Sequence, residues 1–305
     1  MPNETIEFAK LSGSGNDFLC IDNRAGDFDE ILSSPERVGH FARTLCRRGL
    51  GIGADGVIFA VIPEVEGFAD LGARVFEADG SEAELCGNGT ACFIHWAFVN
   101  GYVVGPEIKV LTPAGVVLGQ NGGADYVRVC IPLPEDMQTD LELTVGGETW
   151  RCDFVVTGVP HVVCNVDCVD AVDIAHWGPL LRNHPRFAPR GVNANFVEVL
   201  GEGELAIRTW EFGVEGETLA CGTGSAAAAI VTAIKNRWPK EYTTGQRPVR
   251  LRARSGDVLV VYFTLADDGS VTDVCLETIV RFVCRGLVAD QLAAQAMRRD
   301  VPAAL

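Results

Sequence analysis

Short stretches in which apolar and polar residues alternate occur throughout the chain, and this spacing is typical of half-buried β-strands. In the first half it predicts strands at Ile6–Leu11, Phe18–Asp22, Val57–Ile62, Ala73–Glu77, Ile108–Leu111 and Val116–Leu118. Two segments carry apolar residues at helical spacing instead, Pro35–Leu45 and Thr90–Asn100, and Gly101 stops the second. The first half is therefore a mixture of strands and helices.

The second half repeats this general plan. Its strands are predicted at Phe154–Val156, His161–Cys164, Asn195–Leu200, Leu205–Trp210, Val249–Ala253, Val258–Phe263 and Val271–Leu276. Helices are predicted at Val172–Leu181 and Gly224–Asn236. The glycine- and asparagine-rich residues 120–125 are soon followed by Pro132 and Pro134, which predicts a domain boundary between them. The expected domains are residues 1–131 and 132–281.

Two similar motifs lie about 135 residues apart in corresponding places of the two halves. They are Cys86-Gly87-Asn88-Gly89-Thr90 and Cys221-Gly222-Thr223-Gly224-Ser225. Each precedes a predicted helix, and the period is too long for a solenoid repeat. The pattern indicates an internal duplication and favours two similar α+β domains that face each other across a cleft.

A cysteine before such a helix lies at the helix N-terminus, where unpaired N–H groups and the positive end of the dipole stabilise a thiolate. The same N–H groups can hold a carboxylate, and the glycines allow a ligand to approach the backbone closely. Two such cysteines can remove a proton from one face of a carbon acid and deliver one to the other face. The pair therefore predicts acid/base catalysis on a substrate that bears a carboxylate.

Composition limits the classes of binding partner that we expect. The chain has 305 residues, a formal net charge of −16 and 48% hydrophobic residues. Such an acidic balance argues against nucleic acids and anionic membranes as partners, because both need a basic face. The longest apolar run, Ala226–Ile234, is too short to span a bilayer, and residues 1–7 do not resemble a signal peptide. A cytoplasmic location is therefore expected.

Eleven cysteines is a high and odd number, and none occurs in a zinc-ribbon spacing. Cys164 and Cys168 bracket three residues and form a weak metal candidate. Most of seven others lie among apolar residues and are predicted to be buried small hydrophobes. The seven are Cys20, Cys46, Cys92, Cys130, Cys152, Cys275 and Cys284.

Several segments resemble the diaminopimelate epimerase family, a group of cofactor-independent two-cysteine enzymes of lysine and cell-wall biosynthesis. They are residues 15–18 (GNDF), 47–48 with 51–56 (GIGADG), 78–89 (ADGSEAELCGNG), 158–161 (GVPH), 192–193, 210–211 and 216–224 (GETLACGTG). The resemblance covers nearly the whole chain. It implies two pseudo-symmetric α+β domains, each a curled mixed sheet around a central helix. It also implies that residues from about 282 to 305 return to the first domain.

Position by position, the resemblance implies that Cys86 and Cys221 are the acid/base pair. It implies that His161 and Glu211 poise their protonation. The implied substrate contacts are Asn16, Gly87, Asn88, Asn193, Gly222 and Thr223. Read from their local sequence alone, Asn16 and Asn193 could be simple turn residues and His161 a strand histidine. No metal or pyridoxal phosphate is expected, because the two thiols and the loop amides supply the stabilisation. The expected partner is a small amino-acid substrate, and a homodimer stays open.

The chain departs from the family pattern at several positions. Glu77 and Val159 stand where the family usually has asparagine, and Phe212 stands where it usually has arginine. All three match positions that hold the second, non-reacting end of diaminopimelate. Ala91 also replaces a common arginine, the loop 213–216 is about one residue longer, and residues 276–279 (LETI) replace a usual Gly-Pro-Ala.

These departures leave the substrate open. The lost arginine would remove a carboxylate clamp, Glu77 would attract a cation, and Phe212 would suit a flat or apolar side chain. One reading is a diaminopimelate epimerase whose distal contacts moved to other residues. Another is a racemase of an amino acid with one stereocentre, such as histidine. Further alternatives are an isomerase that moves a double bond, a non-catalytic amino-acid-binding protein and a thiol-redox protein.

Overall fold

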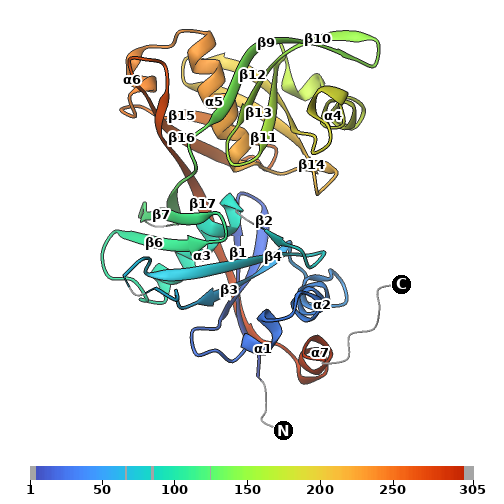
Figure 1. Cartoon of the computed structure of the whole chain (residues 1–305), viewed down its shortest axis with the longest axis vertical. Helices are drawn as coiled ribbons and strands as arrows, with labels where there is room; N and C mark the ends of the chain where they lie inside the picture. Colours follow the sequence, from blue (N-terminus) through green and yellow to red (C-terminus); the bar gives the residue numbers. More distant parts are fainter. Residues whose placement is uncertain (1–4, 66, 84–85, 124, 299–305) are drawn as a thin grey trace. The chain divides into compact units, whose positions relative to one another are not determined.

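The computed structural model describes residues 5–65, 67–83, 86–123 and 125–298 of the chain. The chain divides into two compact units: unit 1 is residues 1–129 with 280–305, and unit 2 is residues 130–279. The predicted boundaries, after residue 131 and near residue 282, each differ by two residues from these. The long strand β17 (Val271–Leu287) begins in unit 2 and ends in unit 1 (Figure 1).

Unit 1 is a mixed sheet with four helices among the described residues. Its strands are β1 (Glu7–Gly13), β2 (Asn16–Asp22), β3 (Gly56–Val61), β4 (Leu71–Glu77), β5 (Glu82–Ala83), β6 (Glu107–Thr112), β7 (Gly115–Asn121), β8 (Tyr126–Cys130) and the end of β17. Its helices are α1 (Asp29–Leu32), α2 (Pro35–Cys46), α3 (Gly87–Val99) and α7 (Asp290–Ala296).

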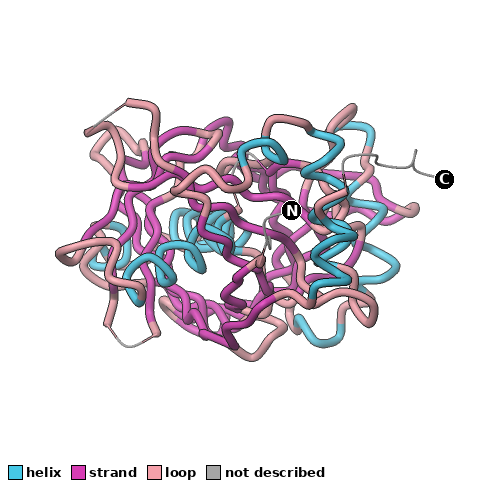
Figure 2. Tube along the Cα trace, turned by 90° about the horizontal axis from the view of Figure 1, so that it is seen from below, coloured by secondary structure: helices cyan, strands magenta, loops and turns pink. Residues whose placement is uncertain are grey.

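Unit 2 is a second mixed sheet with its own helices. Its strands are β9 (Glu135–Val145), β10 (Glu148–Val156), β11 (Pro160–Asn165), β12 (Asn193–Gly201), β13 (Glu204–Glu211), β14 (Gly216–Thr218), β15 (Val249–Arg252), β16 (Val258–Leu265) and the start of β17. Its helices are α4 (Ile174–Arg182), α5 (Gly222–Lys235) and α6 (Lys240–Thr243), with 3₁₀ turns at Val169–Ala171 and Pro185–Phe187. Strands make up more of the trace than helices do (Figure 2).

The strand pairings of the two units match one another. In unit 1, β2 pairs parallel with β3 and β4 pairs parallel with β6. In unit 2, β11 pairs parallel with β12 and β13 pairs parallel with β15. The hairpins β3–β4, β6–β7 and β4–β5 have antiparallel counterparts in β12–β13, β15–β16 and β13–β14. The internal duplication inferred from the two cysteine motifs therefore extends to the sheet topology.

Each sheet curls around one central helix. Helix α3 is buried from Asn88 to Ala97, and its side chains pack against residues from β1 to β8 and β17. Helix α5 is buried from Ser225 to Ala233 and packs against residues from β10 to β17. A helix enclosed on all sides must be apolar around its whole circumference. The alanine run 226–229 of α5 meets this need and leaves room for the surrounding strands.

A second helix covers the opposite face of each sheet. Helix α2 packs Val38, Phe41 and Leu45 against β2, β3 and β4. It begins with the Ser34 side chain accepting a hydrogen bond from the backbone N–H of Arg37 at 3.3 Å. Helix α4 buries Ile174 and Leu181 against β10, β11 and β12. Each unit therefore has three layers, with the sheet between two helices.

Some sequence expectations were wrong in detail. The two central helices begin at Gly87 and Gly222, before the predicted Thr90 and Gly224, because their cysteines cap the first turn. Strand β9 was not predicted, since most of its side chains are polar and exposed. Its position comes from pairing with β10, a tertiary contact that local sequence does not encode.

Most of the seven cysteines were predicted to be buried small hydrophobes, and three of the seven are not. Cys130 and Cys275 form a disulfide, and Cys284 is exposed. Cys20, Cys46, Cys92 and Cys152 are free and buried, as predicted. In the described part of the chain, no helix combines the length and the apolarity needed to cross a bilayer.

Candidate active site

Cys86 caps the N-terminus of helix α3. Its backbone is extended, with φ −118° and ψ 107°, and its sulfur accepts a hydrogen bond from the N–H of Gly89 at 3.4 Å. The side chain is half-buried. The sulfur thus occupies the place that a serine or aspartate oxygen takes in an ordinary N-cap, beside the unpaired N–H groups of the first turn.

Cys221 caps helix α5 in the same way. Its φ and ψ are −123° and 112°, and its sulfur accepts from the N–H of Gly224 at 3.4 Å. The residue is only 8% exposed. Glycine is required at position 224, because a Cβ there would collide with the Asn195 side chain. The two cysteine motifs therefore build the same cap at the start of the central helix of each unit.

Glu211, at the end of strand β13, lies beside Cys221. Its carboxylate is hydrogen-bonded to the Cys221 thiol and accepts a further bond from Thr218 Oγ1 at 2.6 Å. Burial raises the pKa of Glu211. Burial and the adjacent Glu211 carboxylate also raise the pKa of Cys221 well above its usual value, and they outweigh the opposing hydrogen bonds from Thr223 and Gly224. Cys221 is therefore a neutral thiol at neutral pH, not the thiolate expected from a helix N-terminus alone.

His161 connects to Cys221 through a threonine. Its Nε2 lies 3.0 Å from Thr223 Oγ1, and Thr223 Oγ1 lies 3.6 Å from Cys221 Sγ. Burial lowers the pKa of His161 to about 3, so the ring is neutral. Asn195 Nδ2 lies 3.2 Å from the other ring nitrogen, Nδ1.

The orientation of Asn195 fixes the tautomer of His161. Asn195 Nδ2 donates to the Val162 carbonyl at 2.9 Å, and its Oδ1 accepts from Thr209 Oγ1 at 3.0 Å. Its amide nitrogen therefore faces His161 Nδ1, which accepts, and the ring proton is on Nε2 and points to Thr223. Asn195 was not among the residues expected at the site. A polar residue in the buried strand β12, two positions after Asn193, was the signal available.

A charged network organises the corresponding region of unit 1. Asn16 Oδ1 accepts from Asn88 Nδ2 at 2.7 Å, and Asn16 Nδ2 lies 3.3 Å from Asp55 Oδ2. Arg48 bridges Asp17 and Asp55, with N–O distances of 2.5 and 2.9 Å. The network thus fixes Asn16 against the first turn of α3.

Lys10 completes the network. Its ammonium lies 2.9 Å from Asp17 Oδ2 and also donates to the Gly53 carbonyl. Burial alone would raise the pKa of Asp17, but hydrogen bonds from Arg48 and Lys10 outweigh it and lower that pKa. No role was expected for Lys10, Arg48 or Asp55, although residues 48 and 55 lie inside family-like segments.

The remaining predicted residues lie near these two regions. Glu77 is half-buried at the end of β4, and Gly87 and Gly222 are the first residues of α3 and α5. Asn193 is buried and accepts from the N–H of Phe212 at 2.9 Å, which fixes the end of β13. The predicted residues therefore form one cluster in each unit. That both clusters serve one cleft stays a prediction.

Arginines lie beside Phe212, where the family resemblance implies an arginine. The guanidinium carbons of Arg182 and Arg190 lie 5.4 and 5.6 Å from the centroid of the Phe212 ring. Arg182 is held by Glu215 at 2.9 Å, and its Nη1 donates to the Arg190 carbonyl at 3.2 Å. Arg190 itself is exposed. Ala91, by contrast, is fully buried in the core around α3.

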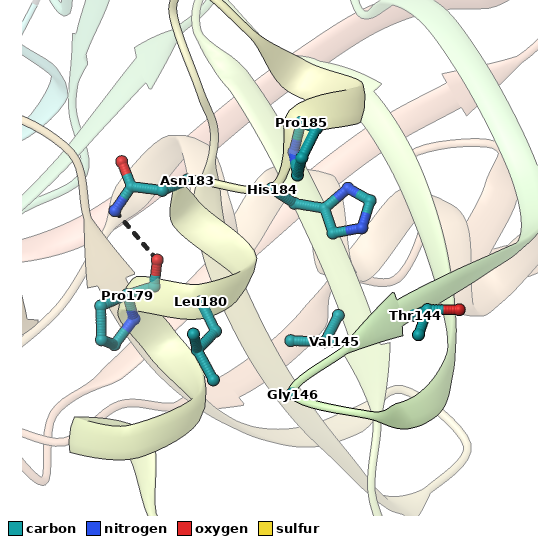
Figure 3. Close-up of a pocket in the computed structure, with 8 residues that line it drawn as sticks. All are labelled: Thr144, Val145, Gly146, Pro179, Leu180, Asn183, His184 and Pro185. Atoms are coloured by element: carbon teal, nitrogen blue, oxygen red, sulfur yellow. Dashed lines mark hydrogen bonds between the residues drawn. The ribbon is translucent and has the colours of Figure 1, made fainter.

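Other candidate features lie away from these clusters. A pocket of about 420 Å³ lies between α4 and the β9–β10 hairpin and is lined by none of the predicted site residues (Figure 3). Cys164 is buried against Cys152 whereas Cys168 is exposed, so the weak metal candidate gains no support. Cys130, Asp273 and Cys275 lie together, but the two sulfurs are joined as a disulfide.

Comparison with known sequences gives a consistent family match. The diaminopimelate epimerase family pattern matches residues 8–129 and 154–263. The diaminopimelate epimerase of Aquifex aeolicus is 40% identical over 266 residues, which cover 85% of this chain and 90% of that one. Those of Methanocella arvoryzae and Synechocystis are 40% and 36% identical, over 74% and 78% of this chain and 81% and 87% of theirs.

Solved structures with much lower identity share the fold. A phenazine biosynthesis protein of the PhzF family from Bacillus anthracis superimposes with a TM-score of 0.69 at 16% identity, covering 94% of this chain and 99% of that one. A probable proline racemase from Agrobacterium radiobacter gives 0.67 at 16% identity, with 93% of each chain covered. These similarities confirm the predicted fold of curled α+β domains.

Proposed function

Because the chain belongs to the diaminopimelate epimerase family, it is an isomerase of the epimerase and racemase class, and we propose that it inverts Cα of diaminopimelate by proton transfer between Cys86 and Cys221. The observation that carries this proposal is the matched pair of caps, each with its sulfur 3.4 Å from the third N–H of a central helix. The proposed reaction converts the LL isomer to the meso isomer.

In the proposed mechanism, one cysteine removes the Cα proton and the other delivers a proton to the opposite face. Cys221 is a thiol, so it is the donor when Cys86 acts as base. In the reverse direction the Cys86 thiol donates to the opposite face, and the sulfur of Cys221 takes the Cα proton while its own proton passes to the Glu211 carboxylate. His161, neutral and hydrogen-bonded to Thr223, holds the Thr223 hydroxyl beside the sulfur.

The backbone N–H groups at the two helix N-termini are proposed to hold the substrate carboxylate. The electron pair released from the C–H bond moves into this carboxylate and forms an enediolate, whose second negative charge needs stabilisation. N–H groups and the positive helix end supply it without a cofactor. Gly87 and Gly222 suit this role, because they leave the backbone open at the first helical position.

Arg190 is the residue we propose to bind the distal carboxylate of diaminopimelate. The position of the usual arginine is Phe212, and Arg190 lies 5.6 Å from that ring. Arg182 is engaged by Glu215, whereas Arg190 is exposed. Arg190→Met should raise the KM for diaminopimelate about tenfold or more, which corresponds to a loss of about 1.4 kcal/mol of binding free energy. The control is Arg186→Met, an exposed arginine in the same segment that bonds Gln138 at 2.8 Å.

A racemase of a single-centre amino acid is the second candidate. Glu77 and Phe212 favour it, because a carboxylate and an aromatic ring would suit a cationic or flat side chain such as that of histidine. This candidate predicts no effect of Arg190→Met on the preferred substrate.

The deciding experiment is a screen of diaminopimelate isomers and single amino acids in deuterium oxide. Chiral chromatography reads the inversion, and mass spectrometry reads the deuterium at Cα. The proposal expects diaminopimelate to have the highest kcat/KM, after dialysis against a chelator and without pyridoxal phosphate. A higher kcat/KM for any single-centre amino acid would replace diaminopimelate as the substrate. Absence of exchange with every substrate would overturn the proposal.

A further inference from the structure

Glu77 and Glu211 occupy equivalent places in the two units. In each unit a short hairpin leads from this glutamate to the cap cysteine. Counting along the ladders, the equivalent pairs are Val75 with Thr209, Glu77 with Glu211, Ala83 with Thr218 and Cys86 with Cys221. Val75 pairs with Ala83, and Thr209 pairs with Thr218. In both units the glutamate lies two residues after the first member of this pair (Val75 or Thr209). The cysteine lies three residues after the second member (Ala83 or Thr218).

An ion pair on the opposite face of the same hairpins supports this equivalence. In unit 1, Arg74 Nε lies 2.7 Å from Glu82 Oε1. In unit 2, Arg208 Nε lies 2.6 Å from Glu217 Oε1. Both pairs are doubled by a second bond from Nη2, at 2.9 Å in each case. The duplication therefore preserves side-chain interactions as well as the backbone.

The alternation of strand β4 directs Glu77 toward helix α3. Leu71, Ala73 and Val75 belong to the core around α3, whereas Phe76 belongs to the core around α2. The β3–β4 ladder runs without a register shift up to the pair of Gly56 with Glu77. Successive side chains of a strand point to opposite faces, so Glu77 shares the face of Val75.

Strand β13 has the same alternation. Leu205 and Ile207 pack in the core around α5, and Glu211, four residues after Ile207, reaches the Cys221 thiol. Glu77 therefore has the same relation to helix α3 as Glu211 has to helix α5.

We propose that Glu77 is the positioning carboxylate of Cys86, as Glu211 is of Cys221, so that each cysteine has a glutamate proton acceptor on its own unit. This inference rests on the proposed function for its role in the reaction. The resemblance implies an asparagine at position 77, and an asparagine cannot accept a proton. The carboxylate thus gives this chain a second cysteine–glutamate pair.

The proton balance follows that of the Cys221 pair. The Cys86 S–H proton moves to the Glu77 carboxylate while the sulfur takes the Cα proton, and the C–H electron pair enters the substrate carboxylate. The Cys221 thiol then protonates the opposite face of Cα, which returns this electron pair to a C–H bond, and Cys221 recovers its proton from the Glu211 carboxylic acid. Glu77 becomes a carboxylic acid and the S–H group is restored. The next turnover in the opposite direction returns both protons along the same route, so no oxidant, reductant or additional reactant is required.

Other ionisable groups surround the Cys86 cap and set the background for the test. From β1 and β2 these are Lys10, Asp17 and Cys20. At the end of α2, burial and then the charges of Asp17, Asp55 and Glu77 raise the pKa of Cys46, and Arg48 lowers it. Cys92 lies on α3 itself. Asp17 and Asp55 are offset by ion pairs with Lys10 and Arg48. A change confined to Glu77 therefore reports the charge of that residue.

The test is Glu77→Gln in the full-length protein, with two readings. Iodoacetamide alkylation of Cys86, followed by mass spectrometry of its peptide from pH 6 to 10, should become about tenfold faster near pH 7, because loss of a nearby anion lowers the pKa of a thiol. The kcat for epimerisation should fall about a hundredfold, because the proton acceptor is lost. A side chain that merely supports the fold would not produce opposite changes in these two rates.

Three variants complete the design. Glu82→Gln changes a carboxylate in the same hairpin and should alter neither rate. Glu211→Gln should give the same opposite changes at Cys221. Glu77→Asn, the residue implied by the resemblance, repeats the test in case the glutamine variant is unstable. The proposal is overturned if the pH profile of Cys86 alkylation is unchanged, or if alkylation accelerates while kcat stays at its wild-type value.

A separate variant, Cys86→Ala, tests the proposed function itself. Epimerisation that survives Cys86→Ala would overturn the two-cysteine mechanism, and the alkylation profile would still report whether Glu77 acts on Cys86. Loss of epimerisation in Cys86→Ala with no effect of Glu77→Gln on either rate would leave the mechanism standing and reject the role of Glu77.

Discussion

The two cysteine caps have the same backbone conformation, but the side chains around them differ. Around Cys221, the Glu211 carboxylate contacts the thiol, and the neutral groups of His161, Thr223 and Asn195 form a hydrogen-bonded chain. Around Cys86, ion pairs dominate, with Lys10 and Arg48 holding two aspartates that fix Asn16. Duplication thus preserved the helix caps and a glutamate at the equivalent position of each hairpin, while the side chains that fix Thr223 and Asn16 diverged.

This difference shows that a helix N-terminus does not by itself decide the protonation of a cysteine. The hydrogen bond from Gly224 lowers the pKa of Cys221. Burial and the Glu211 carboxylate raise this pKa by more, so the net shift is upward. A two-base enzyme needs one sulfur ready to accept a proton and one ready to donate. The neutral thiol of Cys221 suits the donor.

The largest expected effect comes from removing either sulfur. Cys86→Ser and Cys221→Ser should each lower the rate of epimerisation by about a thousandfold or more, because a hydroxyl is far less acidic than a thiol. Chiral chromatography measures the rate, and circular dichroism checks the fold. Near-normal inversion by either variant would mean that the two caps are not both acid/bases.

A substrate with a leaving group at Cβ sharpens this comparison. Elimination needs proton removal from one face alone, so one of the two serine variants should still release the leaving group from a given stereoisomer. The other variant should release it from the opposite stereoisomer. Equal loss of elimination in both variants with both stereoisomers would contradict a division of labour between the caps.

Local features of the site could be predicted from sequence. Both cysteine caps follow from the Cys-Gly-x-Gly pattern before a helix, because capping depends on residues within one turn. The strands near residues 18–22 and 161–164 follow from their apolar runs. The duplication was also visible, since the two motifs stand in corresponding places.

Contacts between distant segments could not be predicted in the same way. The bond from His161 to Thr223 joins residues 62 positions apart and depends on the register of β11 against α5. The disulfide of Cys130 and Cys275 joins residues 145 positions apart. The arginines beside Phe212 come from the segment after α4, so sequence alone indicated a lost arginine and not its neighbours.

The second prediction concerns acid stability, which should separate unit 2 from unit 1. The pKa of His161 is lowered from 6.5 to about 3 in the folded protein. The unfolded chain therefore binds a proton below pH 6.5 that the folded protein does not. The stability contributed by neutral His161 is complete above pH 6.5 and is lost as pH falls toward 3, by about 1.4 kcal/mol per pH unit.

Urea unfolding at several pH values measures this loss. The free energy of unfolding of His161→Gln should fall less steeply between pH 6.5 and 4 than that of the wild type. His176 is exposed, so His176→Gln is the matched control and should keep the wild-type slope. Identical slopes for all three proteins would show that His161 is not held neutral by burial.

The third prediction breaks the neutral chain in unit 2. Thr223→Val removes the hydroxyl between His161 and Cys221 and leaves the buried His161 Nε2–H without that partner. An unsatisfied buried donor costs about 1–3 kcal/mol, so the free energy of unfolding should fall by that amount. Thr223→Ser retains the hydroxyl and should behave like the wild type. A valine variant as stable as the serine variant would show that the hydrogen bond between His161 and Thr223 does not stabilise unit 2.

The smallest expected effect comes from the ionic network of unit 1. Arg48 bridges Asp17 and Asp55, but its side chain is 61% exposed, so solvent screens the pairs. Arg48→Met should lower the free energy of unfolding by about 1 kcal/mol or less. The difference from the wild type should shrink in 1 M salt, where the Debye length is only about 3 Å. The KM should rise while kcat stays near its wild-type value, since Arg48 orients Asp55 and through it Asn16, which is predicted to contact the substrate and not to carry a proton. A collapse of kcat in Arg48→Met would instead show that the ions around Cys86 set its protonation, as Glu211 does for Cys221, and the contrast between the two caps would have to be redrawn.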